Sequence, residues 1–129
     1  MTKEDVDKFE KTQGQLEGLL SEISVIAKKT PNDGVNKFKL KFINEIVLTG
    51  NIVLGDSYRP LDSFEQFDEE ALPSNSDVTF ILSQYLKCFE KLRSDNIRSS
   101  VRYDGTIEWF WIIDKNTSDI KTSPPKKLK

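Results

Sequence analysis

Histidine is absent from this 129-residue chain, and cysteine occurs only once, as Cys88. Without histidine the chain cannot build a Ser-His-Asp triad, a His-based general acid or base, or most zinc sites. A single cysteine excludes an intramolecular disulfide. Because a reactive cysteine usually lies beside a base or a positive charge, we interpret Cys88 as a buried structural residue. We therefore expect no catalytic residues, no metal site and no cofactor.

Long apolar runs are also missing. No stretch approaches the roughly 18 residues that a membrane-spanning helix needs. The N-terminal sequence "MTKEDVDKFEK" is charged and contains no apolar core of the kind found in signal peptides. We therefore expect no membrane association and a cytoplasmic location.

The composition is that of a globular protein without a basic excess. Apolar residues make up 36% of the chain and charged residues 31%. The net charge of −2 and the pI near 5.3 differ from the basic balance typical of dedicated nucleic-acid-binding proteins. We expect one globular domain over residues 1–114 and a disordered or loosely docked basic tail over residues 115–129.

Two helices are predicted from capping residues and apolar spacing. Over residues 2–29, Thr2 and Asp5 form a capping-box pattern, and Gly14 with Gly18 suggests a face that another element approaches closely. The apolar stripe of this helix comprises Val6, Phe9, Leu16, Leu20, Ile23 and Ala27. A further helix begins after Ser74 and ends near residues 95–96. Its stripe comprises Val78, Ile81, Leu82, Tyr85, Phe89 and Leu92.

Residues 38–54 have two interpretations. "FKLKF" alternates as a half-buried strand does, and "EIVLTGNIVLG" resembles a hairpin around Gly50. As a helix, the segment begins after Asn32 or Asp33 and stops at Leu54-Gly55. Its apolar side then comprises Val35, Phe38, Phe42, Ile46 and Val53. We favour the helix, while the β-branched cluster leaves the strand open.

The stretch "VRYDGTIEWFWII" (101–113) predicts a β-hairpin. Asp104-Gly105 suits a two-residue type I′ turn, in which both residues have positive φ. Strand pleating places Trp109 and Trp111 on one face, which we expect to close the core, and Phe110 with Ile112 on the other. The predicted fold is mainly α (α+β), with a three-helix core, a C-terminal β-hairpin and a flexible basic tail.

The candidate partner surface combines the outer face of this hairpin with the long segment 56–76. That segment carries six carboxylates against one arginine, and its aromatic residues attach it to the helices. Loops of this length inside small domains are often functional. The candidate residues are Phe110, Ile112, Phe64, Phe67, Asp68, Glu69 and Glu70.

A second hypothesis concerns the C-terminal tail, which holds five lysines against one aspartate. Lysine side chains bind phosphates without sequence selectivity. The candidate nucleic-acid contacts are Lys121, Lys126, Lys127 and Lys129.

We expect a small non-catalytic interaction or regulatory protein that acts by binding a protein partner. A leftover apolar stripe on a small helical protein is also compatible with a homodimer. The alternative is a nucleic-acid-associated protein that uses the lysine-rich tail and the aromatic hairpin.

Overall fold

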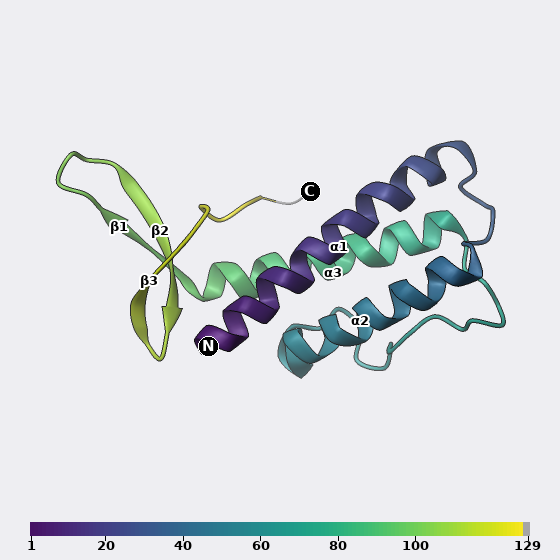
Figure 1. Ribbon diagram of the computed structural model, residues 1–129, viewed down its shortest axis with the longest axis horizontal. Coiled ribbons are helices and arrows are strands. Elements are labelled where there is room, and N and C mark those ends of the chain that lie inside the picture. The colour runs from purple at the N-terminus through teal and green to yellow at the C-terminus, as the bar shows by residue number, and fades with distance from the viewer. Residues whose placement is uncertain (128–129) are drawn as a thin grey trace.

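The computed structural model describes residues 1–127, which form three helices followed by a three-stranded antiparallel sheet. The helices lie side by side, and the sheet lies beyond one end of them (Figure 1). The predicted class, mainly α within an α+β arrangement, is confirmed. The elements are α1 (Lys3–Lys29), α2 (Lys37–Tyr58), α3 (Asn75–Asp95), β1 (Ile97–Val101), β2 (Ile107–Ile113) and β3 (Asn116–Thr122).

The caps of α1 and α3 are those predicted. Thr2 Oγ1 accepts a hydrogen bond from the Asp5 N–H at 3.1 Å, and the Asp5 carboxylate accepts one from the Thr2 N–H at 2.9 Å. Ser74 Oγ accepts a hydrogen bond from the Asp77 N–H at 3.0 Å. Both caps satisfy backbone donors that a helix N-terminus otherwise leaves without a partner.

Residues 38–54 are helical, so the helix prediction for this segment is confirmed. The cap is Asn36 instead of the predicted Asn32 or Asp33, and its side-chain oxygen accepts hydrogen bonds from two backbone N–H groups of the first turn. The helix continues for one short turn beyond the predicted stop, with a break at Gly55, where φ is 67°.

The buried face of α2 differs from the prediction. Val35 and Ile46 are buried as expected, but the side chains of Phe38 and Phe42 are 84% and 50% exposed. The residues that α2 buries are Leu40, Ile43, Asn44, Ile46, Val47, Gly50, Asn51 and Leu54. The prediction failed because α2 has apolar residues on two opposite faces, and periodicity alone does not tell which face is buried.

Gly50 lies where α2 faces α3. A Cβ atom built there would lie 3.5 Å from the rings of Tyr85 and Phe89, an ordinary van der Waals contact, so the site has room for a methyl group but not for a large side chain. The close packing predicted for Gly14 and Gly18 is wrong, since both are exposed and an added Cβ would have no neighbour within 4 Å.

The segment between α2 and α3 is attached to the helices through two buried asparagines. Asn44 Nδ2 donates to the Phe67 carbonyl at 3.0 Å, and the Phe67 N–H donates to Asn44 Oδ1 at 2.9 Å. Asn51 Nδ2 donates to the Phe64 carbonyl at 3.1 Å, and its Oδ1 accepts a hydrogen bond from the Tyr85 hydroxyl at 2.6 Å. Because these side-chain amides are paired, their burial does not leave unsatisfied polar atoms.

The predicted hairpin is present as β1 and β2, and the sheet extends one strand further. Residues 116–122, which we expected in the tail, form β3 along the other edge of β2. Ile97 pairs with Trp111 across β1 and β2, and Lys121 pairs with Phe110 across β2 and β3. A polar sequence suffices for β3, because Ile120 supplies its apolar contact with the core.

The pair of positive φ angles that we predicted for the β1–β2 turn occurs at the β2–β3 turn. At the β1–β2 connection only Gly105 of the predicted pair has a positive φ, 89°, so the type I′ turn at Asp104-Gly105 is wrong. Paired positive φ angles instead occur at Asp114 (51°) and Lys115 (69°), between β2 and β3. Two-residue hairpins favour this geometry because it matches the strand twist.

Aromatic packing joins the sheet to the helices. The Trp111 side chain is fully buried and meets the Phe9 ring edge-on, with ring centroids 5.1 Å apart. The Phe9 ring in turn lies 5.0 Å from Phe89 on α3. Trp109 is half-buried against the same core. The two tryptophans therefore close the core as predicted, whereas Ile107, which pleating places on the same face, is 60% exposed.

The glycine assignments give a direct stability test. Replacing Gly14 by Ala is expected to stabilise the chain by about 0.5–1 kcal/mol, because the site is an open helix interior. Replacing Gly50 by Leu is expected to destabilise it by about 2 kcal/mol or more, because the added atoms overlap the α3 rings. Urea denaturation of both variants measures the difference, and a destabilised Gly14→Ala chain would contradict the assignment.

Candidate protein-interaction surfaces

The outer side of α2 carries an exposed apolar stripe, which we call the α2 stripe. It consists of Phe38, Phe42, Leu48 and Ile52, whose side chains are 84%, 50%, 38% and 70% exposed. At 100° per residue the centre of this stripe lies opposite the centre of the buried face of the helix. Lys41 and Glu45 lie within the stripe and are exposed.

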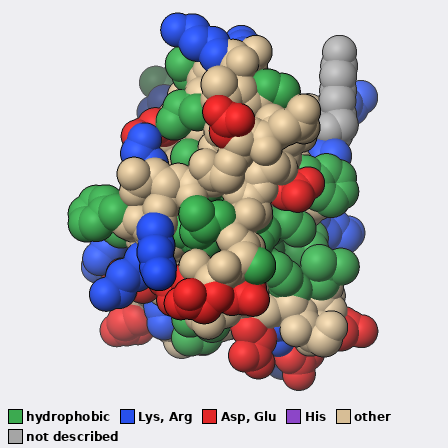
Figure 2. Space-filling model, turned by 90° about the vertical axis from the view of Figure 1, so that its right-hand side faces the viewer, with side chains coloured by type: hydrophobic (Ala, Val, Ile, Leu, Met, Phe, Trp, Pro, Cys, Tyr) green, Lys and Arg blue, Asp and Glu red, His purple; other side chains and the backbone are tan. Residues whose placement is uncertain are grey.

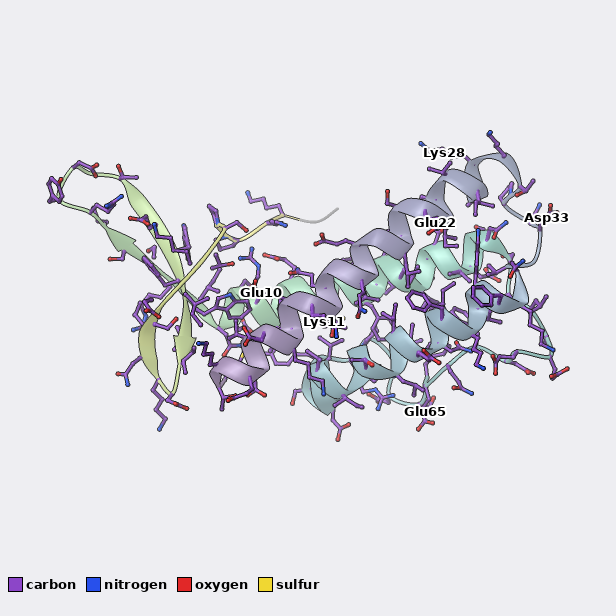
Figure 3. All side chains as sticks on the ribbon, viewed as in Figure 1. Glu10, Lys11, Glu22, Lys28, Asp33 and Glu65 are labelled. Carbon is purple, nitrogen blue, oxygen red and sulfur yellow. The ribbon has the colours of Figure 1, made fainter. Side chains whose placement is uncertain are left out.

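A groove runs between α1 and α2 beside this stripe. Its volume is about 360 Å³, and its lining is Leu19, Glu22, Ile23, Phe38, Lys39 and Phe42. Glu22, labelled on α1 in Figure 3, forms an ion pair with Lys39 on α2 at 3.5 Å. The charged pair borders an otherwise apolar cleft, a lining typical of protein-binding surfaces.

A second apolar surface lies at the turn between β1 and β2, which projects away from the helices (Figure 1). We call it the hairpin tip and define it as Val101, Tyr103 and Ile107. Their side chains are 68%, 101% and 60% exposed, so they contribute little to the core. Val101 and Ile107 pair across the strands, with the Tyr103 ring beyond them.

Hydrogen bonds hold the hairpin tip in one conformation. The Gly105 N–H donates to the Arg102 carbonyl at 2.9 Å, and the Arg102 N–H donates to the Thr106 carbonyl at 2.8 Å. The Thr106 N–H also donates to the Asp104 carboxylate at 2.9 Å, and this bond lowers the pKa of Asp104. The exposed Tyr103 ring is therefore presented on an ordered turn.

Phe110 and Ile112 lie on the outer face of the sheet, as predicted, and both are half-buried. Strand pairing places Arg98 and Lys121 on either side of Phe110. The outer face therefore presents one aromatic ring between two basic residues.

An ion-pair cluster crosses the same face. The Glu108 carboxylate forms ion pairs with Lys121 Nζ at 2.6 Å and with Arg102 Nε at 2.9 Å. The hydrogen bond from Lys121 and the nearby Arg102 charge lower the pKa of Glu108. Because the pKa of Glu108 is lower in the folded chain than in the unfolded chain, the cluster stabilises the fold at pH values above the ordinary glutamate pKa. That contribution is lost as the pH falls through the lowered value.

The acidic segment divides into inward and outward residues. Phe64 and Phe67 are half-buried, pack against the core and meet edge-on at 5.2 Å. The predicted attachment of this segment is therefore confirmed, and these two rings do not lie open on the surface.

Most acidic residues of the segment face outward. Asp68 and Glu70 are exposed, and Glu70 forms an ion pair with Lys37 at 3.7 Å. Glu69 is half-buried. Figure 2 views the end of the bundle far from the sheet, where acidic side chains gather along the lower edge.

The predicted nucleic-acid contacts do not form one described cluster. Lys121 lies on β3 and is paired with Glu108. The backbone of Lys126 is bound to α3, Lys127 is exposed, and Lys129 lies outside the described residues.

Residues 123–126, which we call the strap, are bound to α3 by a buried ion pair. Arg93 donates to Glu90 through Nε at 2.9 Å and Nη2 at 2.8 Å. Its remaining N–H groups donate to the Thr122 hydroxyl and to the carbonyls of Ser123 and Pro124, at 2.7–2.9 Å. All five guanidinium donors are thus satisfied. Sequence reasoning missed this site because periodicity gives no reason to bury Arg93.

Within residues 1–127, acidic and sulfur-containing side chains form no group of three with metal-site geometry. None of the helices in this part of the chain has an apolar stretch of the length that a bilayer crossing requires. Cys88 is half-buried against the core, and burial raises the pKa of its thiol, which fits the predicted structural role.

Comparison of the chain with protein-family models, with curated proteins and with solved structures finds no match. The surfaces described above are therefore the observations from which a function is inferred.

The Glu108 cluster can be tested by a pH titration. Replacing Lys121 by Met is expected to raise the pKa of Glu108 toward its ordinary value, because the shortest hydrogen bond to the carboxylate is removed. Side-chain carboxyl NMR measures this pKa. Lys115→Met is the matched control, since Lys115 lies in the neighbouring turn, and an equal pKa shift in both variants would contradict the assignment.

The attachment of the strap to α3 can be tested by removing the Arg93 guanidinium. Arg93→Met is expected to cost about 3–5 kcal/mol, because Glu90 is left as a buried charge without a partner. Lys91→Met, which removes an exposed pair with Asp95, is expected to cost less than about 1 kcal/mol. Both values come from urea denaturation, and an Arg93→Met chain as stable as Lys91→Met would refute the role of the strap.

Proposed function

We propose that this chain is a non-catalytic accessory protein that acts by binding another protein, and that the hairpin tip enters the partner. The observation that carries the proposal is the Tyr103 side chain, which is fully exposed on an ordered turn beyond the helices. Tyrosine is enriched among the residues that dominate binding energy at protein interfaces. Its apolar ring and polar hydroxyl suit a surface that is wet when free and buried when bound.

The order of the turn supports binding. A flexible loop loses conformational entropy when it docks, and that loss opposes association. Here the backbone hydrogen bonds around Arg102, Thr106 and Gly105 already fix the turn. Little of the interaction energy is therefore used to order the hairpin tip.

The neighbouring residues indicate the chemistry of the partner. Val101 and Ile107 extend the apolar contact on both sides of the turn, on the face of the hairpin that carries Trp109, whereas Phe110 and Arg98 lie on the opposite face. Arg102, next to Val101 and Tyr103 in the chain, adds a basic side chain at the turn. A concave apolar pocket with an acidic rim is the complementary surface.

A protein partner fits these residues better than a nucleic acid does. Lys121 and Arg102 are both paired with Glu108, which reduces the positive charge available for phosphates. The chain as a whole carries a net charge of −2. Phosphate binding depends mainly on unpaired basic charge.

The test compares three full-length baits in extracts of the source cells after nuclease treatment. They are the wild type, a Tyr103→Ser/Ile107→Thr double variant, and Phe80→Ser, which removes an exposed ring on α3. We expect a protein that the wild type and Phe80→Ser retain and the double variant loses. With that protein purified, calorimetry should give a Kd at least roughly 30-fold weaker for the double variant, the effect of removing an interface hot spot.

Two outcomes would contradict the proposal. If the purified partner binds the double variant as tightly as the wild type, the hairpin tip is not its site. If the ligand that depends on the tip is a nucleic acid, which omission of the nuclease reveals, the proposed class of partner is wrong.

A further inference from the structure

The α2 stripe has no role in the fold or in the function proposed for the hairpin tip. Phe38 is 84% exposed and Ile52 is 70% exposed, although the opposite side of the same helix supplies part of the core. Contiguous exposed apolar patches of this kind mark interaction sites in soluble proteins. The hairpin tip lies at the far end of the molecule from the start of α2 (Figure 1), so the two surfaces are separate.

We propose that the α2 stripe binds the α2 stripe of a second copy of this chain, with the two helices antiparallel, to form a homodimer. A two-fold axis brings the same patch of each copy together, as in most symmetric dimers. Pairing Phe38 of one copy with Ile52 of the other places the axis near Glu45.

The apolar area of the stripe fits a dimer of ordinary size. With roughly 200 Å² for a fully exposed phenylalanine and slightly less for leucine or isoleucine, the exposed fractions of the four side chains leave about 450 Å² per copy. A standard interface buries about 800 Å² per partner. Homodimer interfaces are about 65% apolar, so the α2 stripe supplies most of the apolar share.

The charges along α2 favour the antiparallel arrangement. The start of the helix carries Lys37, Lys39 and Lys41, and its acidic residues, Glu45 and Asp56, lie near the middle and near the C-terminal end. Antiparallel helices place the basic start of one copy beside the C-terminal part of the other, which contains Asp56 and no lysine. The two helix dipoles are then also antiparallel, which is the favourable arrangement for neighbouring helices. A parallel pair would place lysines beside lysines.

One reciprocal ion pair follows from this register. Lys41 and Glu45 are exposed within the α2 stripe, and neither forms an ion pair within residues 1–127. With the axis near Glu45, Lys41 of one copy lies about one helical turn, roughly 6 Å along the axis, from Glu45 of the second copy. A lysine side chain spans this separation, and the symmetry forms the pair twice.

The first test is the mass of the full chain by sedimentation equilibrium over about 1–300 μM, since a dimer must dissociate on dilution. We expect the mass to rise from 14.8 kDa to twice that value. Phe38→Ser and Ile52→Ser should each weaken the dimer at least roughly 30-fold. Phe80→Ser is the matched control, because it removes an exposed ring outside the α2 stripe and should leave the dissociation constant unchanged.

The second test is charge reversal, which reports the direction of the helices. Lys41→Glu alone and Glu45→Lys alone should each weaken the dimer, because each places like charges together across the axis. The double variant Lys41→Glu/Glu45→Lys should restore association to within about threefold of the wild type, because both reciprocal pairs are re-formed. Circular dichroism of each variant establishes that it is folded.

A chain that stays monomeric at every concentration would overturn the proposal, since the α2 stripe would then not bind a second copy. A dimer that Phe38→Ser and Ile52→Ser leave unchanged would overturn it as well. A double charge variant no better than the single variants would overturn the antiparallel register. None of these outcomes alters the binding expected of the hairpin tip, because Tyr103 and Ile107 lie outside the α2 stripe.

Discussion

The buried guanidinium of Arg93 is the interaction on which the arrangement of helices and sheet depends. It joins α3 to the end of β3 and to the strap, through Glu90, the Thr122 hydroxyl and two main-chain carbonyls. The Lys126 N–H completes the site by donating to Glu90 at 2.8 Å. Because the strap takes part through the backbone atoms of Ser123, Pro124 and Lys126, its sequence has to provide only an extended conformation, which its two prolines favour.

Trp111 also attaches the sheet to the helices, through apolar packing. Its ring packs on Phe9 while Arg93 holds the far edge of the sheet, so β2 and β3 are each attached to the helical bundle. β1 lacks a comparable attachment beyond Ile97, and its distal end carries the hairpin tip. The sheet is therefore attached to the helices at one end, and its other end, the hairpin tip, is exposed to solvent.

Much of the fold follows from local sequence signals, and most of the discrepancies come from long-range contacts. The caps at Thr2 and Ser74 depend on residues a few positions apart, and both were predicted. Which face of α2 is buried depends on contacts between elements distant in sequence, such as that of Gly50 with Tyr85 and Phe89 on α3, which no local pattern contains. Likewise β3 is polar, and it is a strand because β2 offers an edge and Arg93 binds its end.

The candidate surfaces were predicted only in part. Strand pleating alone placed Phe110 and Ile112 on the outer face. The hairpin tip was missed because the sequence predicted only a two-residue turn at Asp104-Gly105, and the exposure of Tyr103 depends on how far the turn projects from the helices. The α2 stripe was missed because Phe38 and Phe42 were assigned to the core. A helix with two apolar faces was the available signal, and such a helix needs two partners.

The central claim is that the hairpin tip and the α2 stripe are separate surfaces with separate occupants. A dilution series of the full chain followed by two-dimensional amide NMR tests it most directly, because each residue reports independently. The account predicts that resonances of residues 38–52 shift with concentration while those of residues 101–107 do not. Concentration-dependent shifts confined to residues 101–107 would contradict it, since the hairpin tip would then be the surface that binds a second copy.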